Sequence, residues 1–193
     1  MNKLPIEDIK RRVSKSPCIY GGASFETHIL FQKDTQLFTI KPTTGFALFC
    51  GIFALPPIIM IAFGIKTYLE TTNFQFLAEN LGLILAGAIF AAVTGVMLVD
   101  FFKRIYFDKR NNRFYKFKFR DKVETELSRI VAIQVIGEIV KSKKNRFNSF
   151  ELNLVLDDAS RINVMDHGNL KGILDDATLL SEFLEIPIWH AES

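Results

Sequence analysis

Two long uncharged stretches constrain this chain more than any other feature. They are residues 42–65 (PTTGFALFCGIFALPPIIMIAFGI) and residues 80–99 (NLGLILAGAIFAAVTGVMLV). Each holds about 20 residues, and a helix of that length spans the roughly 30 Å hydrocarbon core of a bilayer. A helix buried in a soluble core is usually shorter, and a chain of 193 residues is too small to enclose two such helices. The sequence therefore predicts transmembrane helices at 44–66 and 80–101.

The basic residues around these stretches predict how the helices are oriented. Residues 1–41 contain seven Lys or Arg and residues 103–122 contain nine, whereas the connector at 66–79 contains one. Because cytoplasmic flanks keep an excess of basic residues, both flanks are expected inside and the short loop 67–79 outside. The polar first 41 residues also argue against a cleavable signal peptide. We expect a multi-pass protein of the bacterial inner membrane with both termini in the cytoplasm.

Composition favours lipid over nucleic acid as a partner and gives no support for a metal or cofactor. The two cysteines, Cys18 and Cys50, have no metal-ligand spacing, so no metal and no cofactor are expected. The net charge of +3 comes from the basic stretches beside the apolar ones. This pattern favours contact between the chain and the anionic headgroups of the lipid bilayer.

The remaining segments predict a β domain with one helix near each end of the chain. Residues 1–20 form a cytoplasmic segment in which 4–15 favour a short amphipathic helix, lying either on the membrane or on the soluble domain. Residues 26–43 favour a β-hairpin. Asn169 is a suitable N-cap for a C-terminal helix at 169–186, which Pro187 ends. Strands are predicted at 104–108, 113–119, 130–140, 150–156 and 161–164.

These elements predict an α+β membrane protein with a transmembrane two-helix hairpin and a cytoplasmic domain at 103–193. The domain is expected to be an antiparallel β-sheet or partial barrel, capped by the C-terminal helix and similar to a pleckstrin-homology-like (PH-like) fold. The 26–43 hairpin would supply its missing strands. Alternation in 113–119 places Tyr115, Phe117 and Phe119 on the expected core face, and Gly137 suggests a bulge.

The order of these parts also resembles a known kind of protein. The chain is similar to small bacterial inner-membrane proteins with two spans and a cytoplasmic PH-like domain, a family that implies no particular activity. Its layout is more distantly similar to that of the photosystem I assembly protein family, through Phe107-Asp108 and the ending at 180–188. The segments that carry the first resemblance are Gly21-Gly-Ala-Ser-Phe25, Thr27-His28, Phe150-Glu-Leu-Asn-Leu-Val-Leu156 and Arg161-Ile-Asn-Val-Met-Asp-His-Gly168.

Three groups of residues are candidates for function. Gly87, Ala91 and Gly95 are small residues at steps of four, which lets another helix approach closely. The favoured partner is the first helix of the same chain, and a homo-oligomer contact is the alternative. A basic loop is either a solvated hairpin tip or a contact with anionic lipid or an acidic partner. Its residues are Lys141, Lys143, Lys144 and Arg146.

The third candidate is the turn Asp166-His167-Gly168. A histidine beside a carboxylate is a candidate general base, but the same tripeptide is ordinary turn chemistry before a helix cap. No nucleophile or second acid accompanies it, so no catalytic residue is assigned. We therefore expect a membrane-tethered, non-enzymatic interaction or assembly module with a protein partner. The alternative is a small-ligand sensor or enzyme that uses this turn.

Overall fold

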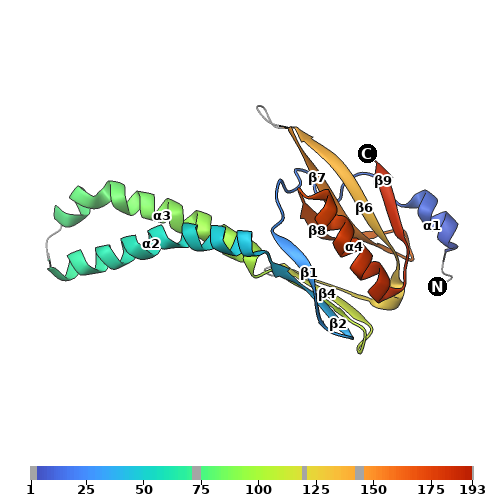
Figure 1. Ribbon diagram of the computed structural model, residues 1–193. Helices are drawn as coiled ribbons and strands as arrows, with labels where there is room; N and C mark the ends of the chain where they lie inside the picture. The colour runs from blue at the N-terminus through green and yellow to red at the C-terminus, as the bar shows by residue number, and fades with distance from the viewer. Residues whose placement is uncertain (1–3, 71–74, 119–120, 142–145, 193) are drawn as a thin grey trace. The chain divides into compact units, whose positions relative to one another are not determined.

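The computed structural model describes residues 4–70, 75–118, 121–141 and 146–192 (Figure 1). The chain divides into two compact units. One joins the residues up to Thr43 to those from Arg104 onward, and the other is Thr44–Lys103. We call them the β unit and the helical unit. The β unit is thus assembled from segments that lie on either side of the helical unit in the sequence.

The first sheet of the β unit, sheet A, is an antiparallel meander. Its strands follow one another in chain order across the sheet. β2 pairs with β3 through Leu37 and Asp108, so the hairpin before the helical unit and the strands after it share one sheet. The strands are β1 (His28–Asp34), β2 (Leu37–Pro42), β3 (Arg104–Asp108), β4 (Arg113–Lys118) and β5 (Asp121–Glu126).

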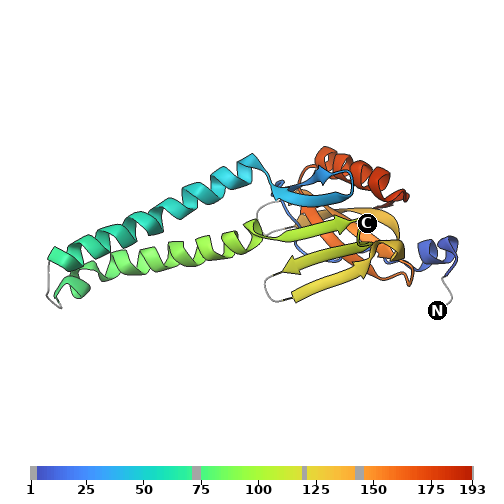
Figure 2. The same cartoon turned by 90° about the horizontal axis from the view of Figure 1, so that it is seen from below.

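The second sheet, sheet B, has the order β8-β7-β6-β9. A short 3₁₀ turn, η1 (Leu127–Arg129), leads from sheet A into it. β9 pairs with β6 in parallel, whereas the other pairs are antiparallel. Figure 2 shows both sheets from below. The strands are β6 (Ile130–Lys141), β7 (Arg146–Leu156), β8 (Arg161–His167) and β9 (Ile188–Glu192).

The main core of the β unit lies on the inner face of sheet B, under helix α4 (Leu170–Leu184). The Asn169 side chain caps α4 by accepting a hydrogen bond from the Gly172 N–H. The apolar stripe of α4 packs against residues of both sheets, and its Phe183 ring lies 4.4 Å from that of Phe38, centroid to centroid. The buried residues of this stripe are Ile173, Ala177, Leu180 and Phe183.

A smaller apolar cluster lies on the other, outer face of sheet B, where helix α1 (Ile6–Arg12) packs. Ile9 and the following Val13 are buried there against a patch from three strands. In Figure 1, α1 lies beyond β9. The N-terminal helix therefore packs against the β unit, which decides between the two positions that the sequence left open. The patch is Ala132, Val155 and Trp189.

The helical unit consists of α2 (Thr44–Glu70) and α3 (Gln75–Phe101), which pack against each other. Among the described residues, Thr44–Gly64 is the one helical stretch long and apolar enough to cross a membrane by length and composition. Leu85–Val99 is a shorter apolar stretch. The structure thus supports one candidate span where the sequence predicts two.

A hydrogen bond joins α2 and α3 beside the two prolines of α2. Pro57 has no N–H to donate to the carbonyl of Phe53, one helical turn earlier. The Thr94 hydroxyl donates to that carbonyl at 2.9 Å, and Thr94 is buried. Thr94 therefore satisfies a backbone acceptor that the proline leaves open.

Three expectations about the β unit are wrong. The core face of β4 carries Phe114 and Lys116, whereas Phe117 is 41% exposed, and Phe119 lies outside the described residues. Phe114 turns inward because it pairs with the buried Phe107, and the long Lys116 stem reaches Asn163 with its ammonium group.

The other two corrections concern strand pairing. The irregularity in β6 lies between Ile130 and Ala132, and Gly137 pairs regularly with Phe150. β5 and β9 were not predicted. β5 was missed because it is rich in charged residues. β9 was missed because it follows Pro187 directly and has five residues, which resemble an irregular C-terminal segment. The helix at 169–186 is therefore not the final element among the described residues.

Candidate functional site

The small residues of α3 meet α2 at one position. A Cβ added to Gly87 would lie 3.2 Å from the terminal methyl carbon of Met60, so Gly87 faces α2. Ala91 is exposed, and nothing lies within 4 Å of a Cβ added to Gly95. Gly87 therefore serves the packing of the two helices, while Ala91 and Gly95 lie outside that contact.

The adjacent Asp166 and His167 do not form a pair. In β8 their side chains point to opposite faces of sheet B, since Asp166 is opposite Glu151 and His167 is opposite Phe150. Asp166 accepts a hydrogen bond from the Asn163 amide at 2.8 Å on the outer face. A carboxylate on the other side of the sheet cannot orient the imidazole, so the general-base arrangement that the tripeptide suggested is absent.

His167 is instead buried where α4 contacts β1. It is fully buried, with Nδ1 3.9 Å from a Glu26 oxygen and Nε2 3.7 Å from an Asp176 oxygen. The same Asp176 oxygen accepts from the Leu30 backbone N–H at 3.0 Å, and Glu26 lies 3.4 Å from the Asn169 amide nitrogen. Within the described ranges no group of three metal-ligating side chains is found.

The basic loop is described at its two ends. Lys141 ends β6, Arg146 begins β7, and these two exposed residues pair across the hairpin. Lys143 and Lys144 lie outside the described residues. The exposure of Lys141 and Arg146 fits both the solvated tip and the anionic contact.

A row of basic residues crosses the outer face of sheet A at the end where the chain enters and leaves the helical unit. Arg104 pairs with Phe117, and Phe117 pairs with Lys122. Continuing the β2–β3 register by two residues places Lys41 opposite Arg104. All four side chains are exposed. We call Lys41, Arg104 and Lys122 the cationic row.

Aromatic rings accompany the cationic row. The Lys41 ammonium lies 4.2 Å from the centre of the Phe31 ring, and the Lys122 ammonium lies 5.1 Å from that of Tyr115. Lys122 also pairs with Glu124, and its hydrogen bond lowers the pKa of that carboxyl. The outer face of sheet A is thus an exposed surface of cations and aromatic rings, a composition suited to the boundary between water and lipid.

Beside the apolar cluster under α1, the outer face of sheet B carries mostly polar side chains. Residues 14–27, which we call the strap, cover this part of the face. Side chains of the sheet form five hydrogen bonds with the main chain of the strap. The Glu151 carboxylate accepts from the N–H groups of Cys18 and Ile19, at 2.8 and 2.7 Å. The Ser149 hydroxyl accepts from Ala23, while Gln134 and Arg161 donate to the carbonyls of Ser14 and Ser16.

Sequence reasoning missed the strap, although one signal was present. Ser149, Glu151 and Asn153 alternate with apolar residues along β7, which indicates one polar face. A polar face is ordinarily solvated, yet these three side chains are fully buried. Only the tertiary structure shows that another segment of the chain covers them.

No family model, curated protein or solved structure matches this chain.

Proposed function

We propose that this chain is a membrane-anchored, non-enzymatic interaction module of the bacterial inner membrane. Residues 44–66 and 80–101 cross the bilayer, and the PH-like β unit lies on the cytoplasmic side against anionic headgroups. The five-strand meander, the three-strand meander and the C-terminal α4 support the PH-like assignment. Burial of His167 and its separation from Asp166 favour this function over the ligand-sensor or enzyme alternative.

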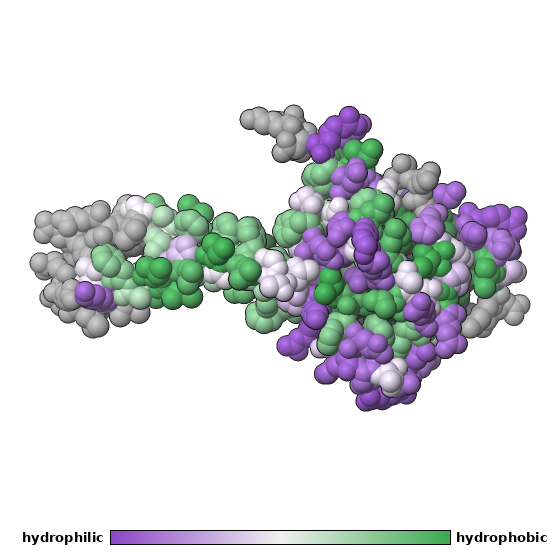
Figure 3. All heavy atoms as spheres, viewed as in Figure 1, coloured by the Kyte–Doolittle hydropathy of each residue, from purple (hydrophilic) through white to green (hydrophobic). Residues whose placement is uncertain are grey.

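The observation that carries the proposal is the apolar outer surface of the helical unit (Figure 3). Large apolar side chains point outward on both helices, among them Ile52 at 64%, Ile59 at 63% and Val96 at 73% exposure. Soluble monomers rarely expose so large a continuous apolar surface. Hydrocarbon is the solvent that such a surface requires, and the polar contact between Thr94 and Phe53 is turned inward, toward the facing helix.

The length of the chain then limits how far the cationic row lies from the bilayer. Lys41 precedes α2 by three residues, and Arg104 follows α3 by three. Three residues span at most about 11 Å. If α2 and α3 cross the bilayer, both side chains therefore lie at headgroup depth, where each basic residue contributes about 1 kcal/mol on an anionic leaflet.

The topology is tested by labelling single cysteines in intact cells with a membrane-impermeant reagent, in a chain without Cys18 and Cys50. A cysteine placed at 67–79 is expected to react, because the connector is translocated. A cysteine at position 193 is expected to react only after the membrane is opened. Labelling of position 193 in intact cells would contradict the proposed orientation.

The lipid contact is tested on the full chain in nanodiscs made of neutral lipid or of neutral plus anionic lipid. Hydrogen exchange of β3–β5 is expected to slow in the anionic discs. The triple substitution Lys41→Gln, Arg104→Gln, Lys122→Gln should abolish this difference. The control Lys10→Gln, Arg12→Gln, Lys171→Gln removes the same charge from exposed positions elsewhere and should preserve it. If both variants lose the difference equally, net charge alone causes the effect.

A further inference from the structure

Between residues 14 and 23, the hydrogen bonds from sheet B to the strap recognise main chain rather than side chains. Each of the five hydrogen bonds joins a sheet side chain to a strap N–H or carbonyl. Such contacts are made equally well by any segment that offers the same backbone groups in the same conformation. The polar face of sheet B therefore has the properties of a peptide-binding groove, and the strap occupies it.

The strap itself buries no apolar side chain, although the fully buried Ile136 lies beside Glu151 on the face that it covers. Val13 before it and His28 after it are buried, but none of the residues 14–27 is buried. Hydrogen bonds of this kind contribute about 0.5–1.5 kcal/mol each, because water replaces them when they open. Release of the strap would wet Gln134, Ser149 and Glu151, which are polar already, together with the apolar Ile136 of the same face, and would leave the α4 core closed. Local opening of this kind is much less costly than unfolding.

The strap also leaves acceptors in the groove unused. The Glu138 Oε1 and Asn153 Oδ1 atoms are buried and have no hydrogen-bond partner among the described residues. Burial next to Glu151 and Asp166 raises the pKa of the Glu138 carboxyl. Buried acceptors without donors are costly. An occupant that donates to these two atoms would fit the groove better than the strap does.

The shape of the groove restricts its occupant at one position. Gly22 has a φ of +37°, and a Cβ there would lie 2.2 Å from the Ser149 hydroxyl oxygen and 2.6 Å from a Glu138 oxygen. The groove therefore requires glycine at this point. It also requires two consecutive non-proline residues at the positions of Cys18 and Ile19, since Glu151 binds both N–H groups.

We propose that the polar face of sheet B is a binding groove for a glycine-containing, turn-forming segment of a partner protein. The strap is its internal competitor and keeps the groove closed until the partner displaces it. The partner segment matches the spacing of residues 18–23: two adjacent free N–H groups, then glycine three positions later, then one more free N–H. This names a partner class for the interaction module proposed above, but it depends only on the β unit.

The test uses the full chain in detergent and two fluorescent synthetic peptides. One has the sequence of residues 14–27, and the other differs only by alanine at the position of Gly22. The protein carries Gly22→Ala, which loosens its own strap. We expect the glycine peptide to bind this protein at least about tenfold more tightly than the alanine peptide. Binding to the unsubstituted chain should be at least about tenfold weaker, because its own strap competes.

Two further measurements make every outcome decisive. Hydrogen exchange must show that α4 stays protected in the Gly22→Ala chain while the Cys18 and Ile19 amides exchange faster; protected amides would overturn the shape argument. Adding Ser149→Ala should weaken binding of the glycine peptide. Equal binding of both peptides, or no binding to a folded chain with an open strap, overturns the proposal. A failed lipid test with successful peptide binding would remove only the membrane contact.

Discussion

The two faces of sheet B bury their side chains by different means. On the inner face, Leu152 and Leu154 of β7 pack into the core under α4. On the outer face of the same strand, Ser149, Glu151 and Asn153 are equally buried, but a strap without buried residues covers them. Apolar burial stabilises the first face, and hydrogen bonds to main chain hold the strap on the second. The difference predicts a closed core beneath an exchangeable cover.

The largest effect should come from the inner face. Leu154 is fully buried, so Leu154→Ala removes apolar contacts and leaves a cavity, at a cost of about 2–5 kcal/mol of unfolding free energy. Denaturant titration of the full chain in detergent measures this through the fluorescence of Trp189, the one tryptophan. Ile139→Ala, at a 60% exposed position of β6, is the control and should change it by less than about 0.5 kcal/mol.

Substitution of His167 tests whether a polar residue on the inner face stabilises the fold mainly by filling space in the core. The ring is fully buried opposite Phe150, so His167→Ala should cost about 2–4 kcal/mol, mainly through the cavity. The same titration measures it. If the variant is stable, abundant and membrane-inserted yet unable to replace the natural protein in cells, the ligand-sensor or enzyme alternative would gain support.

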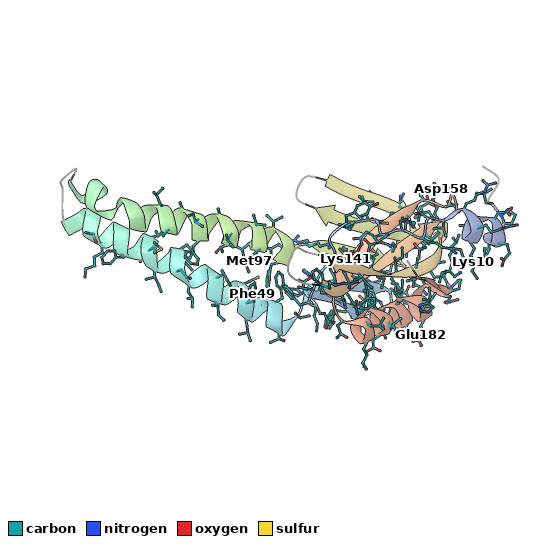
Figure 4. The ribbon with its side chains drawn as sticks, turned by 90° about the horizontal axis from the view of Figure 1, so that it is seen from above. Lys10, Phe49, Met97, Lys141, Asp158 and Glu182 are labelled. Atoms are coloured by element: carbon teal, nitrogen blue, oxygen red, sulfur yellow. The ribbon has the colours of Figure 1, made fainter. Side chains whose placement is uncertain are left out.

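On the outer face, loss of a hydrogen bond to the strap should destabilise the protein less, and only locally. Glu151→Ala removes the acceptor of the Cys18 and Ile19 N–H groups, at about 1–2 kcal/mol, since the freed amides can turn to water. Hydrogen exchange should accelerate at these two amides and stay unchanged in α4. Glu182→Ala, on the exposed side of α4 in Figure 4, is the control. Accelerated exchange throughout α4 would show that the two faces are one cooperative unit.

The smallest effect concerns pH. The raised pKa of Glu138 means that folding favours its protonated form, so its stabilising contribution is full below the ordinary value of 4.5. That contribution is lost as pH rises through the raised folded value. Glu138→Gln should therefore increase the melting temperature slightly at pH 7 relative to the unsubstituted chain, with little difference at pH 4. A decrease at pH 7 would show that the ionised carboxylate has a stabilising partner.

The predictions from sequence succeeded where a local pattern has one structural solution. Strands β3 and β4 and the Asn169 cap follow from alternation and capping chemistry within a few residues. The face of β4 does not, because both of its faces carry aromatic residues. Pairing with Phe107 decided that Phe114 and Lys116 turn inward.

The candidate site shows the same limit. Asp166 and His167 are adjacent in sequence, yet strand alternation sends them to opposite faces. The cationic row combines Lys41, which precedes the helical unit in the chain, with Arg104 and Lys122, which follow it. Neither result can be obtained from spacing alone, because each depends on which strands pair and in which register.

The sequence by itself determined the two apolar stretches, the basic flanks, the helices of the β unit and its strands other than β5 and β9, since local periodicity and charge encode these. Only the tertiary structure decided that residues before and after the helical unit form one sheet, that α1 packs on the β unit, and that the strap covers a polar face. These depend on contacts between residues more than 60 positions apart, such as Cys18 and Glu151, which are separated by 133. No local pattern specifies a contact over that separation.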